Sequence, residues 1–301
     1  MGMSSINNTT TILSLTLLSQ QLNIILGFVI LISGLVGNLL NIVVFLSLGS
    51  FKTNACSFYI LTKSFFDIVA LLVGVGTRIL SQGFHIDFTL SNRLWCKFRI
   101  PLLDVATLCS FSCLCFQSMD TFFVSSRSIF WRRKSNLKVA RNLVILFLCM
   151  WILLDLPYFF LQDLILNVRS GSYTCVTING SYALFRSYFI ILGLYLAIPV
   201  MAISVFGILS YRQFQKLSAH EQLSLSALTK QMIRMILFQI IITLMFVTPN
   251  SLAKIYFVTT ASMIKSAYLL AQESVSQVVF NIYGYGALSV RKFILYTNTV
   301  V

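Results

Sequence analysis

The sequence contains few charged residues. Only 10% of its 301 residues are Asp, Glu, Lys or Arg, whereas a soluble globular domain carries about 25%. Hydrophobic residues make up 57% of the chain, and the mean hydropathy is +0.87. A chain with so few charges cannot cover a soluble surface, so the composition predicts a membrane protein.

Further absences exclude other classes of protein. No charged residue precedes Lys52, so the chain lacks the basic start of a cleavable signal peptide, and Ile6 stands where a myristoylation signal needs Ser or Thr. The only two histidines, His85 and His220, lie in loops, and no HExxH, metal-spaced Cys/His set or Ser/His/Asp grouping occurs. We therefore expect no enzyme and no metal site. The net charge of +14 comes from Lys and Arg spread between apolar segments, which argues against nucleic acid as a partner.

Seven segments are long and apolar enough to cross a bilayer, which takes about 20 mostly apolar residues. The expected spans are residues 22–48, 57–79, 98–123, 141–162, 187–211, 231–257 and 266–290. This predicts an all-α membrane protein with an N-terminal segment (1–21), a seven-helix domain (22–290) in the lipid bilayer and a tail (291–301). The stretch "VRKFILY" after the last span is expected to form a short amphipathic helix on the membrane surface.

The basic residues predict that the N-terminus lies outside the cell. In that orientation the inner loops and tail hold 14 of the 22 Lys and Arg residues, with Lys63 counted among them. Glycosylation sequons at Asn7, Asn8 and Asn179 then all lie on the outer side, where glycans are transferred.

Two of the seven cysteines fall in outer segments. Cys96 precedes the third span and Cys175 lies between the fourth and fifth, where the environment is oxidising. We expect a disulfide between them that holds the second outer loop to the top of the third helix. The alternative is two free, exposed thiols.

Prolines and one carboxylate interrupt the apolar spans. Pro157, Pro199 and Pro249 lie inside the fourth, fifth and sixth spans and predict hinges around one cavity, or ordinary membrane-helix irregularity. Asp67 lies in the middle of the second span, where an acidic residue costs about 2.5–3.5 kcal/mol on insertion scales. It must be protonated or find a partner, and the candidate partners are Asn38, Ser110, Asn281 and Tyr285.

Taken together, these residues resemble the rhodopsin-like family of G-protein-coupled receptors. Matching residues occur in every span, in the family's order. They are Asn38, Asp67, Cys96, Trp151, Pro157, Cys175, Pro199, Pro249 and "NIYGY" from Asn281 to Tyr285. Asp120 stands 24 residues after Cys96, where the family has its Asp-Arg-Tyr motif. That distance is about 36 Å of helix, which places Asp120 at the inner mouth of the third span.

The resemblance implies a plasma-membrane receptor that binds an extracellular ligand and signals to a heterotrimeric G protein. It implies a buried polar site of Asn38, Asp67, Ser110 and Asn281, with room for a sodium ion near Asp67. It also implies a switch region facing the G protein, formed by Asp120, Thr121, Phe122 and Tyr285.

Several positions depart from the family pattern. Thr121 replaces the arginine of the motif, so Asp120 loses its usual partner and is expected to turn to Arg127, Lys138 or Arg141. Val247 stands in place of the family's tryptophan in helix six, Gly207 in place of its tyrosine in helix five, and Ile282 in place of its proline in helix seven. Thr229 and Lys230 stand where the family has an acid at the start of helix six. The scaffold thus matches better than the switch, which indicates altered, weak or constitutive coupling, or a sequence drifting out of use.

The expected ligand pocket lies between the outer halves of helices three, five, six and seven. Its candidate residues are Asp104, Tyr188, Tyr195, Tyr256, Gln272 and Glu273. Amine receptors of the family carry an aspartate where Leu103 stands, and Asp104 would point about 100° away, which disfavours an amine. Asp104 could equally pair with Arg99 or Arg78. Lys265 lies too far out for retinal attachment. A peptide is the default ligand by analogy alone, and a multi-span transporter is the rival function.

Overall fold

The computed structural model describes residues 2–126, 128–167, 172–219, 227–260, 263 and 265–289. The expected amphipathic helix and the tail lie outside these residues. The long helical elements are α1 (Gly2–Ser47), α2 (Ala55–Ala70), α4 (Arg93–Ser125), α6 (Leu137–Leu161), α8 (Ile198–Ala219), α9 (Ala227–Thr259) and α10 (Ala267–Ser289). The short helical elements are η1 (Ser50–Lys52), η2 (Leu71–Gly76), η3 (Ile79–Gly83), α3 (Phe88–Ser91), α5 (Ile129–Lys134), α7 (Gly180–Phe185) and η4 (Arg186–Ala197).

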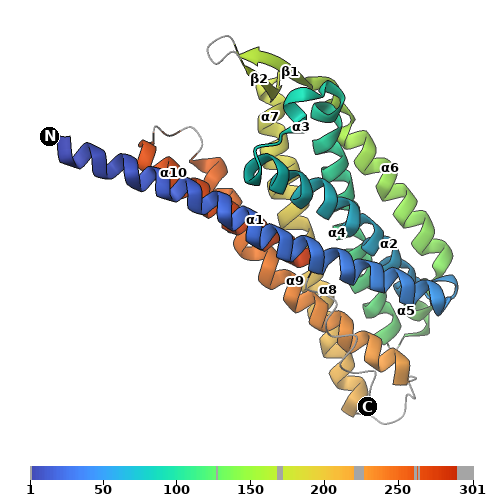
Figure 1. Ribbon diagram of the computed structural model, residues 1–301. Coiled ribbons are helices and arrows are strands. Elements are labelled where there is room, and N and C mark those ends of the chain that lie inside the picture. The colour runs from blue at the N-terminus through green and yellow to red at the C-terminus, as the bar shows by residue number, and fades with distance from the viewer. Residues whose placement is uncertain are drawn as a thin grey trace.

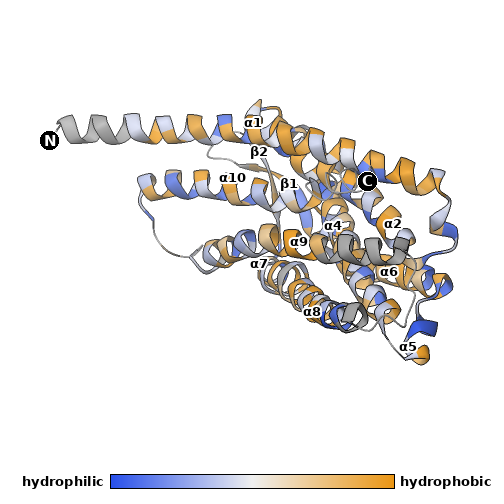
Figure 2. Ribbon diagram, turned by 90° about the horizontal axis from the view of Figure 1, so that it is seen from below, coloured by the Kyte–Doolittle hydropathy of each residue, from blue (hydrophilic) through white to orange (hydrophobic). Residues whose placement is uncertain are grey.

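Six helical segments are long and apolar enough to cross a membrane among the described residues. They are Thr10–Ser47, Ala55–Gly83, Arg93–Ser125, Leu137–Leu161, Gly180–Gln213 and Ile240–Phe257. Apolar side chains point outward from them: Leu153 is 67% and Ile145 is 59% exposed. Figure 2 shows orange residues along much of the long helices, with blue residues at α5 and interspersed along α10. The chain is therefore a helical, multi-pass membrane protein.

The seventh expected span forms a helix but is less apolar than predicted. Helix α10 has 23 residues, which makes it about 35 Å long and sufficient to cross the hydrocarbon core. It is not among the six apolar segments because Gln272, Glu273, Gln277 and Asn281 interrupt its hydrophobic residues. A seventh crossing thus stays a prediction.

The helices begin where short polar side chains can cap them. Asn54, Asn92 and Asn136 accept hydrogen bonds from backbone N–H groups in the first turns of α2, α4 and α6. These groups would otherwise lack partners. The expected prolines all lie in helical segments: Pro157 in α6, Pro249 in α9, and Pro199 at the second position of α8, directly after the π-helical segment η4.

Helix α4 lies at the centre of the bundle. It contacts α2, α6, α8, α9 and η4, while α1 packs along α2 and α10 (Figure 1). The indole Nε1 of Trp151 donates a hydrogen bond to Ser112 Oγ (3.0 Å), which joins α6 to α4. Helix α1 differs from the expected first span because it starts at Gly2 and continues through the segment predicted to precede the membrane.

One departure from an all-α fold occurs in the second predicted outer loop. Strands β1 (Gln162–Asn167) and β2 (Ser172–Thr177) form an antiparallel hairpin with Leu164 opposite Cys175. The hairpin lies at one end of the bundle, beside α3 and α7, while α5 lies at the other (Figure 1). We call these the hairpin end and the α5 end.

Candidate functional site

The hairpin is attached to α4 by a covalent bond and by ion pairs. Cys96, in the first turn of α4, forms the expected disulfide with Cys175 of β2. Arg93 donates two hydrogen bonds to Asp163 of β1 (Nε–Oδ1 2.7 Å, Nη2–Oδ2 2.6 Å), and Lys97 Nζ lies 3.6 Å from the same carboxylate. The hydrogen bonds from Arg93 hold the pKa of Asp163 below its usual range. The hairpin is thus held in place over the end of the bundle.

Asp67 is the acceptor in a buried ion pair. Ser110 Oγ of α4 donates to Asp67 Oδ1, as the sequence suggested. The second partner is Lys63, whose Nζ donates to Asp67 Oδ2 and, at 2.9 Å, to Ser110 Oγ. Lys63 was expected in an inner loop, but it lies one helical turn from Asp67 in α2 and is 3% exposed. Its ammonium group occupies the position beside Asp67 where a sodium ion was expected.

The other expected members of the polar site lie elsewhere. Asn38 Nδ2 donates to the carbonyls of Gly34 (2.9 Å) and Leu288 (3.4 Å), so it joins α1 to α10 rather than contacting Asp67. Asn281 Nδ2 donates to the Gln277 carbonyl within α10 (2.7 Å). Both Asn281 and Tyr285 line a cavity of about 180 Å³ nearer the hairpin end.

Glycines allow α10 to pack closely against η2 and α9. A Cβ atom at Gly74 would lie 2.6 Å from the Tyr285 hydroxyl, and one at Gly286 would lie 2.7 Å from the Phe246 ring. Small residues let membrane helices approach this closely. Tyr285 therefore packs against η2, well away from the α5 end where the resemblance placed it.

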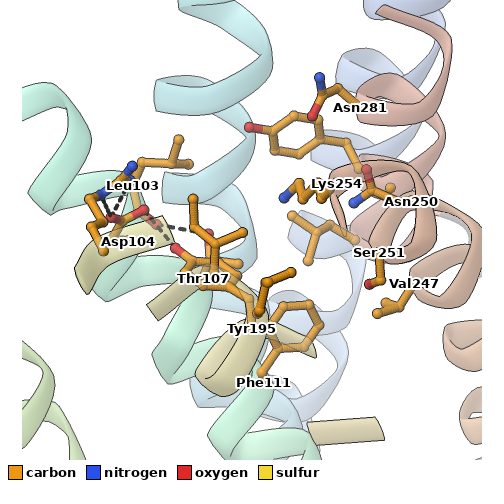
Figure 3. Close-up of a pocket in the computed structure, with 16 residues that line it drawn as sticks. Leu103, Asp104, Thr107, Phe111, Tyr195, Val247, Asn250, Ser251, Lys254 and Asn281 are labelled. Atoms are coloured by element: carbon orange, nitrogen blue, oxygen red, sulfur yellow. Dashed lines mark hydrogen bonds and ion pairs between the residues drawn. The ribbon is translucent and has the colours of Figure 1, made fainter. Parts of the chain in front are cut away.

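The cavity lies between α4, η4, α9 and α10 (Figure 3). Its polar wall consists of Asp104, Thr107, Arg186, Tyr195, Asn250, Ser251, Lys254, Asn281 and Tyr285. Its apolar wall consists of Leu103, Phe111, Ile191, Leu192, Val247, Gly284 and Leu288. Asp104 follows Cys96 by eight residues, or about 12 Å of helix. The cavity therefore lies in the half of the bundle that the hairpin covers.

Asp104, one of the expected pocket residues, lines the cavity, and so does Leu103 before it. Both of its carboxylate oxygens are occupied. Oδ2 accepts hydrogen bonds from Arg186 Nη2 (2.6 Å) and Nε (3.1 Å), and Oδ1 accepts one from the Tyr195 hydroxyl (2.8 Å). The partner is therefore Arg186 rather than Arg99 or Arg78. Because this ion pair balances the charge of Asp104, the carboxylate is a poor counter-ion for an amine ligand.

Two further charged residues in this half of the bundle, Lys254 and Asp155, take part in no ion pair among the described residues. Lys254 of α9 points into the cavity (Figure 3) and lies 5.8 Å from the centre of the Tyr195 ring. No ion pair involves it among the described residues. Asp155 of α6 is 2% exposed, and neither of its carboxylate oxygens has a hydrogen-bond partner. The charges of Asp104 and Arg186 act on this carboxylate.

The remaining residues of the expected pocket do not line this cavity. Tyr188 is 52% exposed. Tyr256, Gln272 and Glu273 line a separate groove between α9 and α10. There the Tyr256 hydroxyl donates to Glu273 Oε1 (2.9 Å), and Lys265 Nζ lies 2.7 Å from both Glu273 oxygens.

Of the switch residues at the α5 end, Asp120 and Thr121 are buried and Phe122 is half-buried, and none of them takes part in an ion pair among the described residues. Asp120 is 5% exposed; it accepts a hydrogen bond from Ser135, and its Oδ2 has no partner. Neither Lys138 nor Arg141 pairs with it, and Arg127 lies outside the described residues. Thr121 Oγ1 donates back to the Gln117 carbonyl (2.8 Å). Phe122 packs against the rings of Phe123, Trp131 and Phe206.

The sequons occupy two different settings. Asn179 is exposed at the hairpin end, where its side chain caps α7 by accepting from the Tyr182 N–H (3.2 Å). Asn7 and Asn8 lie in α1, and their side chains are outside the described ones.

Sequence reasoning missed four charged residues: Lys63, Asp155, Arg186 and Lys254. For three of these residues, the sequence itself contained a feature that could have identified them. Lys63 stands four residues before Asp67, which is the spacing of an ion pair on one helix face. Asp155 and Lys254 fall inside expected spans, where an ionisable side chain marks a candidate functional site. Comparison with protein-family models and with curated proteins finds no match to the chain.

Proposed function

We propose that the protein is a divergent receptor of the rhodopsin-like type. In this proposal it binds an extracellular ligand in the cavity between α4, η4, α9 and α10 and signals across the plasma membrane to a heterotrimeric G protein. The observation that carries the proposal is the cavity itself, which has charged and polar walls and lies under a hairpin joined to α4 by a disulfide. Such a concave site with a few convergent polar groups is the usual form of a ligand pocket.

Two contacts between helices support the same assignment. Asp67 and Ser110 join the second and third helices, and Trp151 and Ser112 join the fourth and third. Both involve residues through which the sequence resembles the family. The match in helix seven contributes nothing, because Tyr285 packs against Gly74 rather than facing the α5 end.

Weak coupling to the G protein is a second candidate, favoured by the environment of Thr121. The residue is 3% exposed, and its hydroxyl is bonded to the Gln117 carbonyl of its own helix. A threonine cannot present the forked, charged donor set of an arginine to a partner protein. In this second candidate function, the protein still binds its ligand in the cavity but activates the G protein only weakly.

Nucleotide exchange on a heterotrimeric G protein tests the proposal. The full chain would be reconstituted in vesicles with the G protein, and exchange would be measured with and without fractions of candidate ligands. Solute uptake into the same vesicles tests the rival transporter function. Exchange above that of protein-free vesicles supports the receptor, and uptake without exchange in either the wild type or Thr121→Arg refutes it.

A further inference from the structure

The charge pattern of the cavity indicates the class of ligand. Neither Asp104 nor Asp155 is available to a ligand in this cavity. Asp104 has both oxygens bonded to Arg186 and Tyr195, so its charge is neutralised within the wall. Asp155 is buried and is not part of the wall. The cavity therefore offers no available anion to a cationic ligand.

Lys254 offers the opposite charge. Its side chain enters the cavity from α9, on the side opposite Asp104 (Figure 3), and no carboxylate of the described residues lies within 4.0 Å of its Nζ. Its ammonium group lies over the face of the Tyr195 ring, 5.8 Å from the ring centre, which is a weaker contact than an ion pair. A partly buried ammonium group with so weak a partner gains from a ligand anion, because charge-assisted hydrogen bonds are about twice as strong as neutral ones.

The surrounding wall adds to this preference. The charges of Arg78, Arg99 and Asp104 all act on Tyr285 in the cavity wall. Because Arg186 already pairs with Asp104, the two other arginines leave an excess of positive charge around this wall. Ser251 and Tyr285 contribute hydroxyl groups that can donate hydrogen bonds to an anion. Phe111 and Val247 contribute apolar surface to the same cavity and belong to one hydrophobic cluster.

The size of the cavity limits the ligand. Its volume is about 180 Å³, slightly larger than the engineered apolar cavity of about 150 Å³ that binds benzene. This space accommodates one ring or a short chain together with a carboxylate, and it is too small for more than a single side chain of a peptide.

We propose that the cavity binds a small organic anion, with its carboxylate on Lys254 and its apolar body against Phe111 and Val247. This inference rests on the proposed function for its biological meaning, since the ligand is taken to be the signal that the receptor detects. The binding itself requires no G protein. It replaces the peptide expected by analogy with a ring-sized carboxylate.

The test compares three probes of one shape on the full chain in lipid nanodiscs. They are 3-phenylpropionate, the uncharged 3-phenylpropionamide and the cationic 3-phenylpropylamine, and binding is measured by saturation-transfer NMR with titration. A hydrogen bond to a charged group is worth about 1.5–3 kcal/mol, so we expect the acid to bind about ten- to hundredfold more tightly than the amide. The amine should bind most weakly.

Variants separate Lys254 from the other cations. Lys254→Met keeps the length of the side chain and should remove the preference for the acid, whereas Lys254→Arg should retain most of it. Lys52→Met, an exposed lysine beyond the end of α1, is the matched control and should leave the preference unchanged.

Three results would overturn the inference: equal binding of acid and amide by the wild type, no binding of any probe at millimolar concentration, or an acid preference that survives in Lys254→Met. The first two need no variant, so misfolding of Lys254→Met cannot obscure them. Failure of the receptor function is distinct. Acid-selective binding without nucleotide exchange supports the site and refutes the signalling role, whereas exchange without acid-selective binding does the reverse.

Discussion

Replacing Lys63 by Met tests whether its ammonium group is the permanent partner of Asp67. The two side chains are each 3% exposed, and Ser110 beside them is fully buried. Removing one partner of a buried ion pair costs about 3–5 kcal/mol, because the remaining charge stays in apolar surroundings. Each 1 kcal/mol lowers the Tm of a chain of 150–250 residues by about 2–4 °C, so we expect a loss of about 6–20 °C.

Thermal unfolding of the purified chain in one detergent measures this loss, with two comparisons. Lys52→Met removes an exposed lysine and should leave Tm within about 2 °C of the wild type, because surface substitutions rarely exceed about 0.5 kcal/mol. The double variant Lys63→Met/Asp67→Leu should recover most of the stability, since an apolar replacement of a buried pair is often neutral or stabilising.

Sodium provides a second readout of the same pair. Because the Lys63 ammonium already bonds Asp67 and Ser110, the wild type should unfold at the same Tm in NaCl and in choline chloride of equal concentration. Lys63→Met leaves Asp67 able to bind a cation and should gain a sodium-specific rise in Tm, as expected for any ligand that binds only the folded state. An unchanged Tm in Lys63→Met would refute the reasoning, as would a sodium-specific rise in the wild type that Asp67→Asn removes.

The remaining predictions concern other parts of the bundle. Thr121→Arg should raise G-protein activation in a dissociation assay, because the new guanidinium lies beside Asp120, whose Oδ2 has no partner; no change or a loss would contradict the altered-switch hypothesis. Asp155→Leu should raise Tm by an amount corresponding to about 1–3 kcal/mol, because it removes buried carboxylate oxygens that have no hydrogen bonds; a fall in Tm would show that the carboxylate has a stabilising partner. Cys96→Ser/Cys175→Ser should cost about 2–5 kcal/mol in thermal unfolding, because the disulfide closes a loop across 79 residues; the same Tm with and without the bond would mean that Arg93 and Asp163 alone hold the hairpin.

Features that depend on local composition were predictable. The length of apolar segments is a property of consecutive residues, so six of the seven expected spans correspond to apolar helical segments. The disulfide was predictable for a related reason: Cys96 and Cys175 are the two cysteines outside the expected spans on one side of the membrane. Helix-breaking prolines could also be placed, since Pro157, Pro199 and Pro249 act within their own segments.

Contacts between buried charged groups on different helical segments were not predictable in the same way. Which side chains meet depends on the rotation and axial position of each helix, and these are decided by packing between distant segments. Arg186 reaches Asp104 across 82 positions of sequence. Tyr285 enters the cavity because Gly74 lets α10 pack closely against η2.

The sequence by itself thus determined a bundle of membrane helices, the hairpin's covalent attachment and the scarcity of buried charge, because each follows from residue type and spacing along the chain. Only the tertiary structure decided that Ser110 joins the local pair of Lys63 and Asp67, that Arg186 neutralises Asp104, and that Lys254 faces the cavity with no carboxylate of the described residues beside it. A charge in a low-dielectric interior is governed by neighbours within a few ångströms, and those neighbours are brought together by the packing of the helices.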